Sequence, residues 1–328
     1  MHAPSALLRV IRPDGSADPA HDPRLEAETI RALYRAMVRT RLLDERLGTL
    51  SQEGRIGFHP TAIGREAAVV GTAGALREGD WLFPTSRDFG AALLRGMPVA
   101  EYLHQVYGSS QDRLHGRQMP GAFSGRSYGL GSVSAPAATH LPHAVGFAWA
   151  ARRRGEDVVT AALFDGAEID AADFHTGLNF AGVWRAPTIF AARVAQDQSA
   201  AEHAVAYGIA SARCDGDDVL AVFRAVRDAL ERATRGEGAT VLDLVESQSD
   251  PLERTRVHLE RLGVWKASDE QALRAEVHEA IDHAILSAAH AGPPALRALF
   301  QDVFAEVPRH LSDQLDEATR LGARAHER

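Results

Sequence analysis

The stretch that decides the fold spans residues 157–167 and reads DVVTAALFDGA. Its nearly unbroken small and apolar side chains predict a buried strand that ends at Asp165-Gly166. Two similar runs follow at 187–192 and 239–245, and stretches with helical periodicity at 170–183 and 217–235 separate the three. Such alternation is typical of βαβ units and a parallel sheet, in which ligands bind at the carboxyl ends of the strands. The sequence therefore predicts an α/β fold with Asp165 at the ligand-binding edge.

The rest of the chain organises itself around this alternation. Residues 1–24 show little periodicity and are expected to form a loose N-terminal arm. A helix is expected from residue 24 to about 51, and a long functional loop over 108–138, where glycine and serine recur without a period. We expect one α/β domain over 25–290 and a helical C-terminal tail over 291–328.

Composition excludes several classes of protein. The 328 residues carry a net charge of −8, which argues against nucleic acid or an anionic membrane as the main partner. Cys214 is the only cysteine, so an internal disulfide is impossible and a cytoplasmic location fits best. The chain has no run of about 18 apolar residues, so no membrane span is expected.

The ends of the first two strands suggest half of a metal site. Mg²⁺ prefers near-octahedral oxygen coordination, and a Mg²⁺–diphosphate site at this edge needs oxygen ligands from both strand ends. Asp165 supplies a carboxylate at the first end, whereas Val194 and Ala195 supply no side-chain oxygen at the second. An Asp-Gly pair after a strand is also a common turn, so these residues alone leave both interpretations open.

A series of motifs, in the same order along residues 25–290, resembles one family. The chain is similar to the α subunits of thiamin-diphosphate-dependent 2-oxo acid dehydrogenases. The matching segments are 33–37 with 44–45, 54–58, 64–67, 83–88, 116–120, 141–146, 173–175, 178–181, 183–187 and 215–219. Residues 251–265 are more similar to the branched-chain type than to the pyruvate type.

The resemblance implies a fold, a reaction and partners. The fold would be the thiamin-diphosphate-binding type, with a parallel sheet, helices on both faces and a helical C-terminal extension. The reaction would be oxidative decarboxylation of a 2-oxo acid, with loss of CO₂ and transfer of the acyl group to a lipoyl carrier. Thiamin diphosphate and Mg²⁺ would be the cofactors. A β-type subunit would complete an α₂β₂ heterotetramer and contribute the carboxylate that activates the cofactor, and a lipoyl acyltransferase would accept the product.

The same resemblance assigns candidate site residues. Asp165 would bind Mg²⁺, with Gly166 and Ala167 beside it, and Arg87 would grip the diphosphate. Arg193 would face a phosphate, although an arginine at a strand end is often only a surface charge. Three further residues match a loop that can hold a monovalent cation, or they simply cap the following helix: Ser134, Pro136 and Thr139.

Departures from the family pattern concentrate at the expected site. Phe164 replaces a glycine, which would add bulk beside the cofactor, and Val194 and Ala195 replace two asparagines, one of them a metal ligand. The segment after residues 196–199 is shortened, and the loop that carries the family's catalytic histidine is missing between 246 and 250. No catalytic residue is therefore assigned, because His258 lies in another segment and His143 and His175 are expected to be structural.

Two hypotheses remain after these departures. The chain is an active α-type subunit, or it is a catalytically retired paralogue that acts as a scaffold or regulator without bound cofactor.

Overall fold

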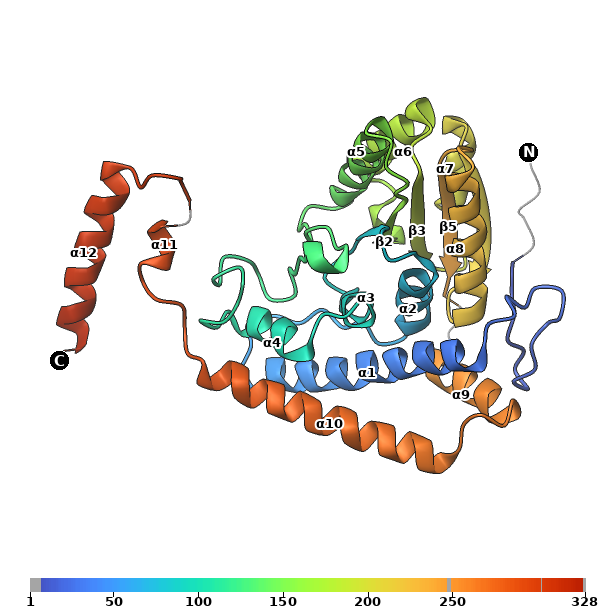
Figure 1. Ribbon diagram of the computed structural model, residues 1–328, viewed down its shortest axis with the longest axis horizontal. Helices are drawn as coiled ribbons and strands as arrows, with labels where there is room; N and C mark the ends of the chain where they lie inside the picture. The colour runs from blue at the N-terminus through green and yellow to red at the C-terminus, as the bar shows by residue number, and fades with distance from the viewer. Residues whose placement is uncertain (1–6, 247–248, 302, 327–328) are drawn as a thin grey trace.

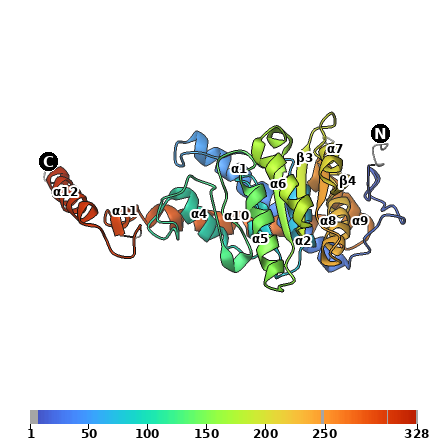
Figure 2. The ribbon, with the colours of Figure 1, turned by 90° about the horizontal axis from the view of Figure 1, so that it is seen from above.

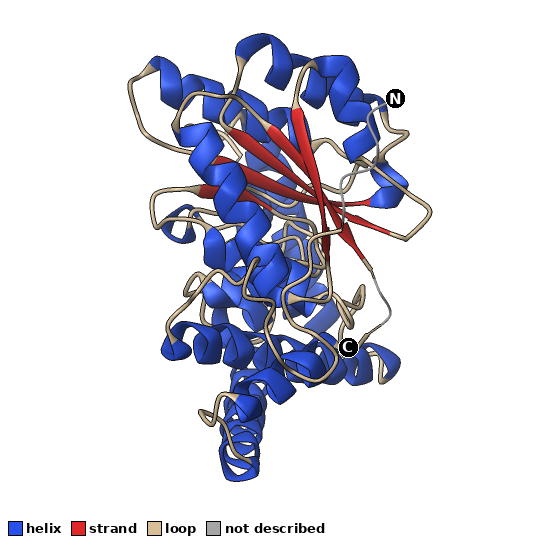
Figure 3. Ribbon diagram, turned by 90° about the vertical axis from the view of Figure 1, so that its right-hand side faces the viewer, coloured by secondary structure: helices blue, strands red, loops and turns tan. Residues whose placement is uncertain are grey.

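The computed structural model describes residues 7–246, 249–301 and 303–326. Five parallel strands form one sheet in the order β1-β2-β3-β5-β4, sandwiched between helices (Figure 3). The strands are β1 (Trp81–Phe83), β2 (Thr160–Asp165), β3 (Thr188–Val194), β4 (Ala210–Asp215) and β5 (Thr240–Val245). The predicted parallel α/β sheet is confirmed, and the three predicted strands are β2, β3 and β5. Strands β1 and β4 were not predicted.

Alternating side chains along the central strands build a core on each face of the sheet. In β2, Ala161 and Leu163 pack with the core under α2 (Glu66–Ala75) and α8 (Val219–Thr234). Ala162 and Phe164 pack on the opposite face with α5 (His140–Arg153) and α6 (Ala172–Trp184). Because successive side chains point to opposite faces, Asp165 belongs to the α2 face. The expected helices on both faces are confirmed.

Most of the remaining helices enclose the α2 face or extend the molecule, whereas α7 packs on the α5 and α6 face. In Figure 1, α10 runs alongside α1, while α11 and α12 stand away from the body, as Figure 2 also shows from above. These helices are α1 (Ala27–Gln52), α3 (Phe89–Leu94), α4 (Val99–Tyr107), α7 (Ala201–Ala204), α9 (Pro251–Arg261), α10 (Ala267–His290), α11 (Ala298–Gln301) and α12 (Arg309–His326). Across the described ranges, no helix is both long and apolar enough to cross a membrane.

The predicted long loop is confirmed. Between residues 108 and 138 the chain forms turns and a single 3₁₀ turn, Arg126–Tyr128. Phe123 and Leu130 of this loop are buried in the main core, so the loop is tied to the body along its length.

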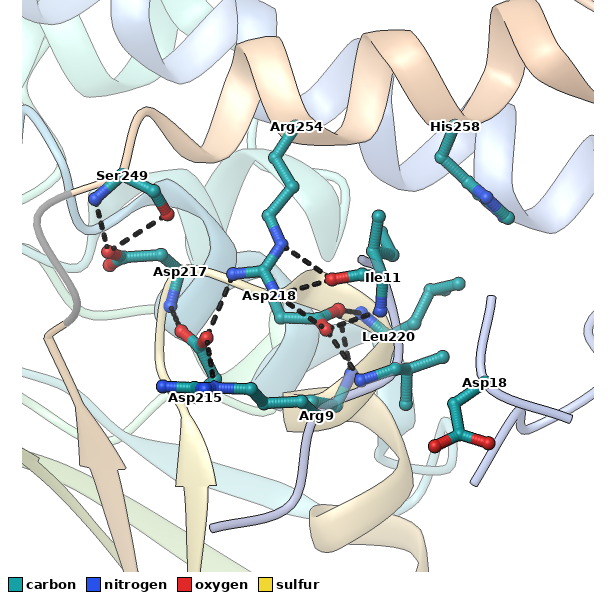
Figure 4. Close-up of polar contacts among 12 residues, drawn as sticks. Arg9, Ile11, Asp18, Asp215, Asp217, Asp218, Leu220, Ser249, Arg254 and His258 are labelled. Carbon is teal, nitrogen blue, oxygen red and sulfur yellow. Dashed lines mark hydrogen bonds and ion pairs between the residues drawn. The ribbon is translucent and has the colours of Figure 1, made fainter. Parts of the chain in front are cut away.

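Part of the expected N-terminal arm is firmly attached to the body (Figure 4). Leu8 bridges to Cys214 at the edge strand β4, and Val10 and Ile11 are buried. The backbone N–H groups of Val10 and Ile11 donate to Asp218 Oδ2 at 2.8 and 2.7 Å. Residues 8–11 are therefore not loose, while the division into arm, domain and tail stays a prediction.

Asp218 is the centre of this attachment. Its Oδ1 atom caps α8 by accepting the N–H groups of Leu220 and Ala221, both at 3.1 Å. Arg254 of α9 lies between Asp218, at 3.3 Å, and Asp215, at 2.9 Å (Figure 4). One buried carboxylate thus joins the arm, α8 and α9.

Candidate functional site

Three arginines surround Asp165 at the carboxyl end of β2. Arg193 of β3 lies beside it in the strand register, and its Nε donates to Asp165 Oδ1 at 2.8 Å. Arg65, which precedes α2, donates to the same oxygen at 2.6 Å. Arg87 lies 3.7 Å from the other carboxylate oxygen. The structure therefore brings together the three predicted residues Asp165, Arg87 and Arg193, and adds Arg65.

Arg193 is a buried charge and not a surface one. Its side chain is 1% exposed and pairs with Asp165 and with Asp88, which is fully buried. The second oxygen of Asp88 accepts the N–H and hydroxyl of Thr85 at 2.7 and 2.9 Å. Burial acts to lower the pKa of Arg193, but Asp88 and Asp165 outweigh it and raise that pKa above its usual value. Arg193 thus stays charged, and its ion pair with Asp88 joins β3 to the loop before α3.

The same contacts keep Asp165 ionised. Burial acts to raise the pKa of Asp165, but the charges of Arg193 and Arg65 outweigh it and lower the pKa to about 2. A carboxyl whose pKa is depressed in the folded state stabilises the protein above its unfolded pKa and loses this contribution as pH falls toward the folded value. Asp165 is therefore an anion whose charge is already compensated.

We expect Asp165→Asn to destabilise the protein more at pH 6 than at pH 3. The ionised carboxylate stabilises the fold by about 2 kcal/mol at pH 6, and about half of this is lost near pH 3, because the Asp165 carboxyl of the unfolded chain takes up a proton there while that of the folded protein stays mostly ionised. Urea unfolding of both proteins at the two pH values measures the difference. An equal effect at both pH values would show that the arginines do not hold the Asp165 charge.

A cavity opens next to these ion pairs at the edge of the sheet. Its volume is about 530 Å³, and its lining consists of Arg41, Thr61, Ile63, Gly64, Arg65, Arg87, Asp217, Glu246, Ser249, Asp250 and Pro251. Arg65 and Arg87 both line the cavity and contact Asp165. The lining also holds three carboxylates, so the cavity contains both signs of charge.

The space over Gly166 is already filled by protein. A Cβ atom on Gly166 would collide with the amide oxygen of Gln198, which lies directly over it. Gly166 and Ala167 belong to the short 3₁₀ helix Gly166–Glu168, and the Glu168 carboxylate accepts the N–H of Asp165 at 3.0 Å. The space beside the glycine backbone, which a cofactor could otherwise approach, is here occupied by Gln198.

The end of β3 supplies no side-chain oxygen that could serve as a second metal ligand. Val194 is buried in the core on the α5 and α6 face, and Ala195 has only a methyl side chain. Phe164 also lies in that core, with its ring centroid 5.7 Å from that of Phe174. The expectation that Phe164 adds bulk beside the cofactor is therefore wrong, because the pleat turns its side chain to the opposite face of the sheet.

The other predicted residues lie in the loop before α5 or outside the described residues. Ser134 and Pro136 lie in the loop before α5, and Thr139 donates to Asp173 at 3.0 Å, so the monovalent-cation site stays a prediction. Ser247 and Gln248 of the shortened loop lie outside the described residues.

Of the three histidines considered from sequence, His175 and His258 occupy structural positions, whereas the side chain of His143 is exposed. His143 lies on α5, and His175 of α6 is hydrogen-bonded to the Tyr207 hydroxyl at 2.9 Å. His258 is buried against the N-terminal arm, with Nδ1 2.8 Å from the carbonyl oxygen of Gly15.

Comparison with known proteins identifies the family. Residues 34–246 match the family model described as the dehydrogenase E1 component. This chain belongs to the dehydrogenase E1 component family. It is 32% identical to the 2-oxoisovalerate dehydrogenase subunit alpha of Pseudomonas aeruginosa, over 95% of this chain and 87% of that protein. Identity is 29% to the mitochondrial subunit alpha of Bos taurus, over 96% and 77% of the two chains. The mitochondrial subunit alpha 2 of Arabidopsis thaliana is 31% identical, over 86% and 68%.

The E1 family depends on thiamin diphosphate, usually with Mg²⁺, and its α subunits pair with β subunits in heterotetramers. The resemblance to α subunits of 2-oxo acid dehydrogenases is thus confirmed. The residues of this chain do not fit the metal. Its candidate ligand Asp165 is paired with arginines, and Ala195 has no side-chain ligand atom to offer. Among the described residues, no group of three or more His, Cys, Asp or Glu side chains could hold a metal ion.

Sequence reasoning missed two residues of this E1 site. Arg65 and Asp88 lie within the matching segments 64–67 and 83–88, but no role was assigned to either. Their positions depend on how α2 and the loop before α3 meet the sheet edge, which no periodicity reveals. The available signal was that both segments carry charged side chains and match the family.

Proposed function

We propose that this chain is an α-type subunit that assembles with a β-type subunit and whose own cofactor half-site is retired. In this role it acts as a scaffold or regulator of an α₂β₂ heterotetramer in the cytoplasm. The observation that carries the proposal is the pairing of Asp165 with Arg65 and Arg193. A carboxylate that already has two guanidinium partners offers a poor ligand to Mg²⁺, which needs several well-placed oxygens.

Exposed apolar surface supports the assembly part of the proposal. On α5 and α6 the rings of Trp149 and Trp184 stack with centroids 4.8 Å apart, and Phe180 lies 4.5 Å from Trp184. Val183 beside them is 70% exposed. Further exposed apolar side chains gather near the C-terminus: Leu296, Leu299, Val303, Phe304, Val307 and Leu321. The ring cluster on α5 and α6 is the kind of exposed apolar surface that marks protein–protein contacts.

The assembly is tested by co-expression with a β-type subunit from the same genome, followed by gel filtration with mass determination. We expect an α₂β₂ species that forms equally well with and without Mg²⁺ and thiamin diphosphate. Val183→Glu should weaken it because a charge would enter an apolar contact, whereas Leu262→Glu, a matched change at an exposed site after α9, should not. A chain that stays apart from every β-type partner would contradict the proposal.

One observation favours a second candidate, the inherited reaction. The cavity at the sheet edge keeps Arg41, Arg65 and Arg87 among its lining residues, and arginine is well suited to binding phosphate groups. On this alternative the chain takes part in oxidative decarboxylation of a branched-chain 2-oxo acid, and a lipoyl acyltransferase receives the acyl group. Cofactor titration separates the two candidates.

A further inference from the structure

Arg65 occupies a position that decides whether Asp165 can bind a cation. Its guanidinium donates to Asp165 at 2.6 Å and lies 4.0 Å from Glu246 at the end of β5. The side chain is 25% exposed and lines the cavity, so it lies between the cavity and the carboxylate. Arg193, by contrast, is also ion-paired with the buried Asp88.

Three guanidinium groups already surround Asp165. Arg65, Arg87 and Arg193 contribute these positive charges, while the carboxylates of Asp88, Glu168 and Glu246 lie beside the cluster. A divalent cation at Asp165 would lie within a few ångströms of three guanidinium groups, and this repulsion is strong where solvent screening is weak. The cation could bind only if a guanidinium left.

We infer that Arg65 is a resident counter-ion that excludes divalent cations from Asp165, and that its removal exposes a latent cation site. Asp165 supplies the carboxylate of such a site, and water can complete the coordination of a hard cation. This inference rests on the proposed retirement of the half-site and names the residue responsible.

The test uses Mn²⁺ as the probe and the purified full chain, with free Mn²⁺ followed by electron paramagnetic resonance. Wild type and Arg65→Lys, which keeps the charge, should show no saturable binding at millimolar Mn²⁺. Arg65→Met keeps the length but supplies neither charge nor oxygen, and it should bind at least about tenfold more tightly. Adding Asp165→Asn to Arg65→Met should abolish the gain.

A matched control is Arg224→Met, which breaks the exposed pair with Asp228 on α8, 2.9 Å long, and should leave Mn²⁺ binding unchanged. Saturable Mn²⁺ binding by the wild type that is lost in Asp165→Asn would overturn the inference. It would also be overturned if Arg65→Met bound no better than wild type, or if its binding survived Asp165→Asn. None of these outcomes depends on a β-type partner, so they are separate from the assembly test.

Discussion

Arg193→Gln lowers the free energy of unfolding by about 3–5 kcal/mol, the largest effect that we expect from a single change at the site. The reason is that Arg193 compensates a fully buried carboxylate, Asp88, and a largely buried one, Asp165. Glutamine can donate hydrogen bonds from its amide but carries no charge, so Asp88 would stay ionised in the interior or take up a proton. Urea or thermal unfolding at neutral pH measures the loss.

A double-mutant cycle separates the ion pair from simple loss of packing. Asp88→Asn in the Arg193→Gln background should recover at least about 1 kcal/mol, because the buried charge is then removed together with its partner. The exposed pair of Arg224 and Asp228 provides the control, and Arg224→Gln should change the unfolding free energy by less than about 0.5 kcal/mol. Equal losses of unfolding free energy in Arg193→Gln and Arg224→Gln would mean that the buried ion pairs stabilise the fold no more than an exposed pair does.

Asp218→Asn is expected to destabilise the protein by about 2–4 kcal/mol and to release the N-terminal arm. The fully buried carboxylate accepts the N–H groups of Val10 and Ile11, caps α8 and pairs with Arg254. The asparagine amide has about the size of the carboxylate, but its NH₂ group is a donor and would face the donors that Asp218 now accepts from. Hydrogen exchange at the two arm amides, together with denaturant unfolding, measures both consequences.

Asp14→Asn is the control for this variant, because Asp14 lies on the exposed part of the same arm. There its carboxylate accepts hydrogen bonds from the N–H and hydroxyl of Ser16. We expect it to leave exchange at Val10 and Ile11 unchanged. Unchanged exchange in Asp218→Asn would show that burial of the apolar side chains alone holds the arm.

The parts of the fold that were predictable are those with a strong period. Strands β2, β3 and β5 are buried on both faces, so their apolar runs stand out from the helices between them. Strand β4 escaped prediction because Ser211 and Arg213 interrupt it at a half-exposed edge. Strand β1 has only three residues, which is too short for alternation to show.

At the site, the chain's own pattern could predict the meeting of Asp165 and Arg193, since the ends of neighbouring parallel strands share one edge. It could not predict which charges would surround Asp165. Arg65 and Asp88 come from segments far away in sequence, and only the packing of α2 and the loop before α3 against the sheet places them there. The sequence alone could predict that Ala195 lacks a side-chain metal ligand. It could not predict that arginines of the same chain would compensate the charge of Asp165.

The most direct measurement is calorimetric titration of the chain, alone and with a β-type subunit, using Mg²⁺ and thiamin diphosphate together. If the half-site is retired, heats of dilution alone will be seen up to millimolar cofactor. Saturable micromolar binding would contradict the account, because it would require Asp165 to leave Arg65 and Arg193 and accept the metal.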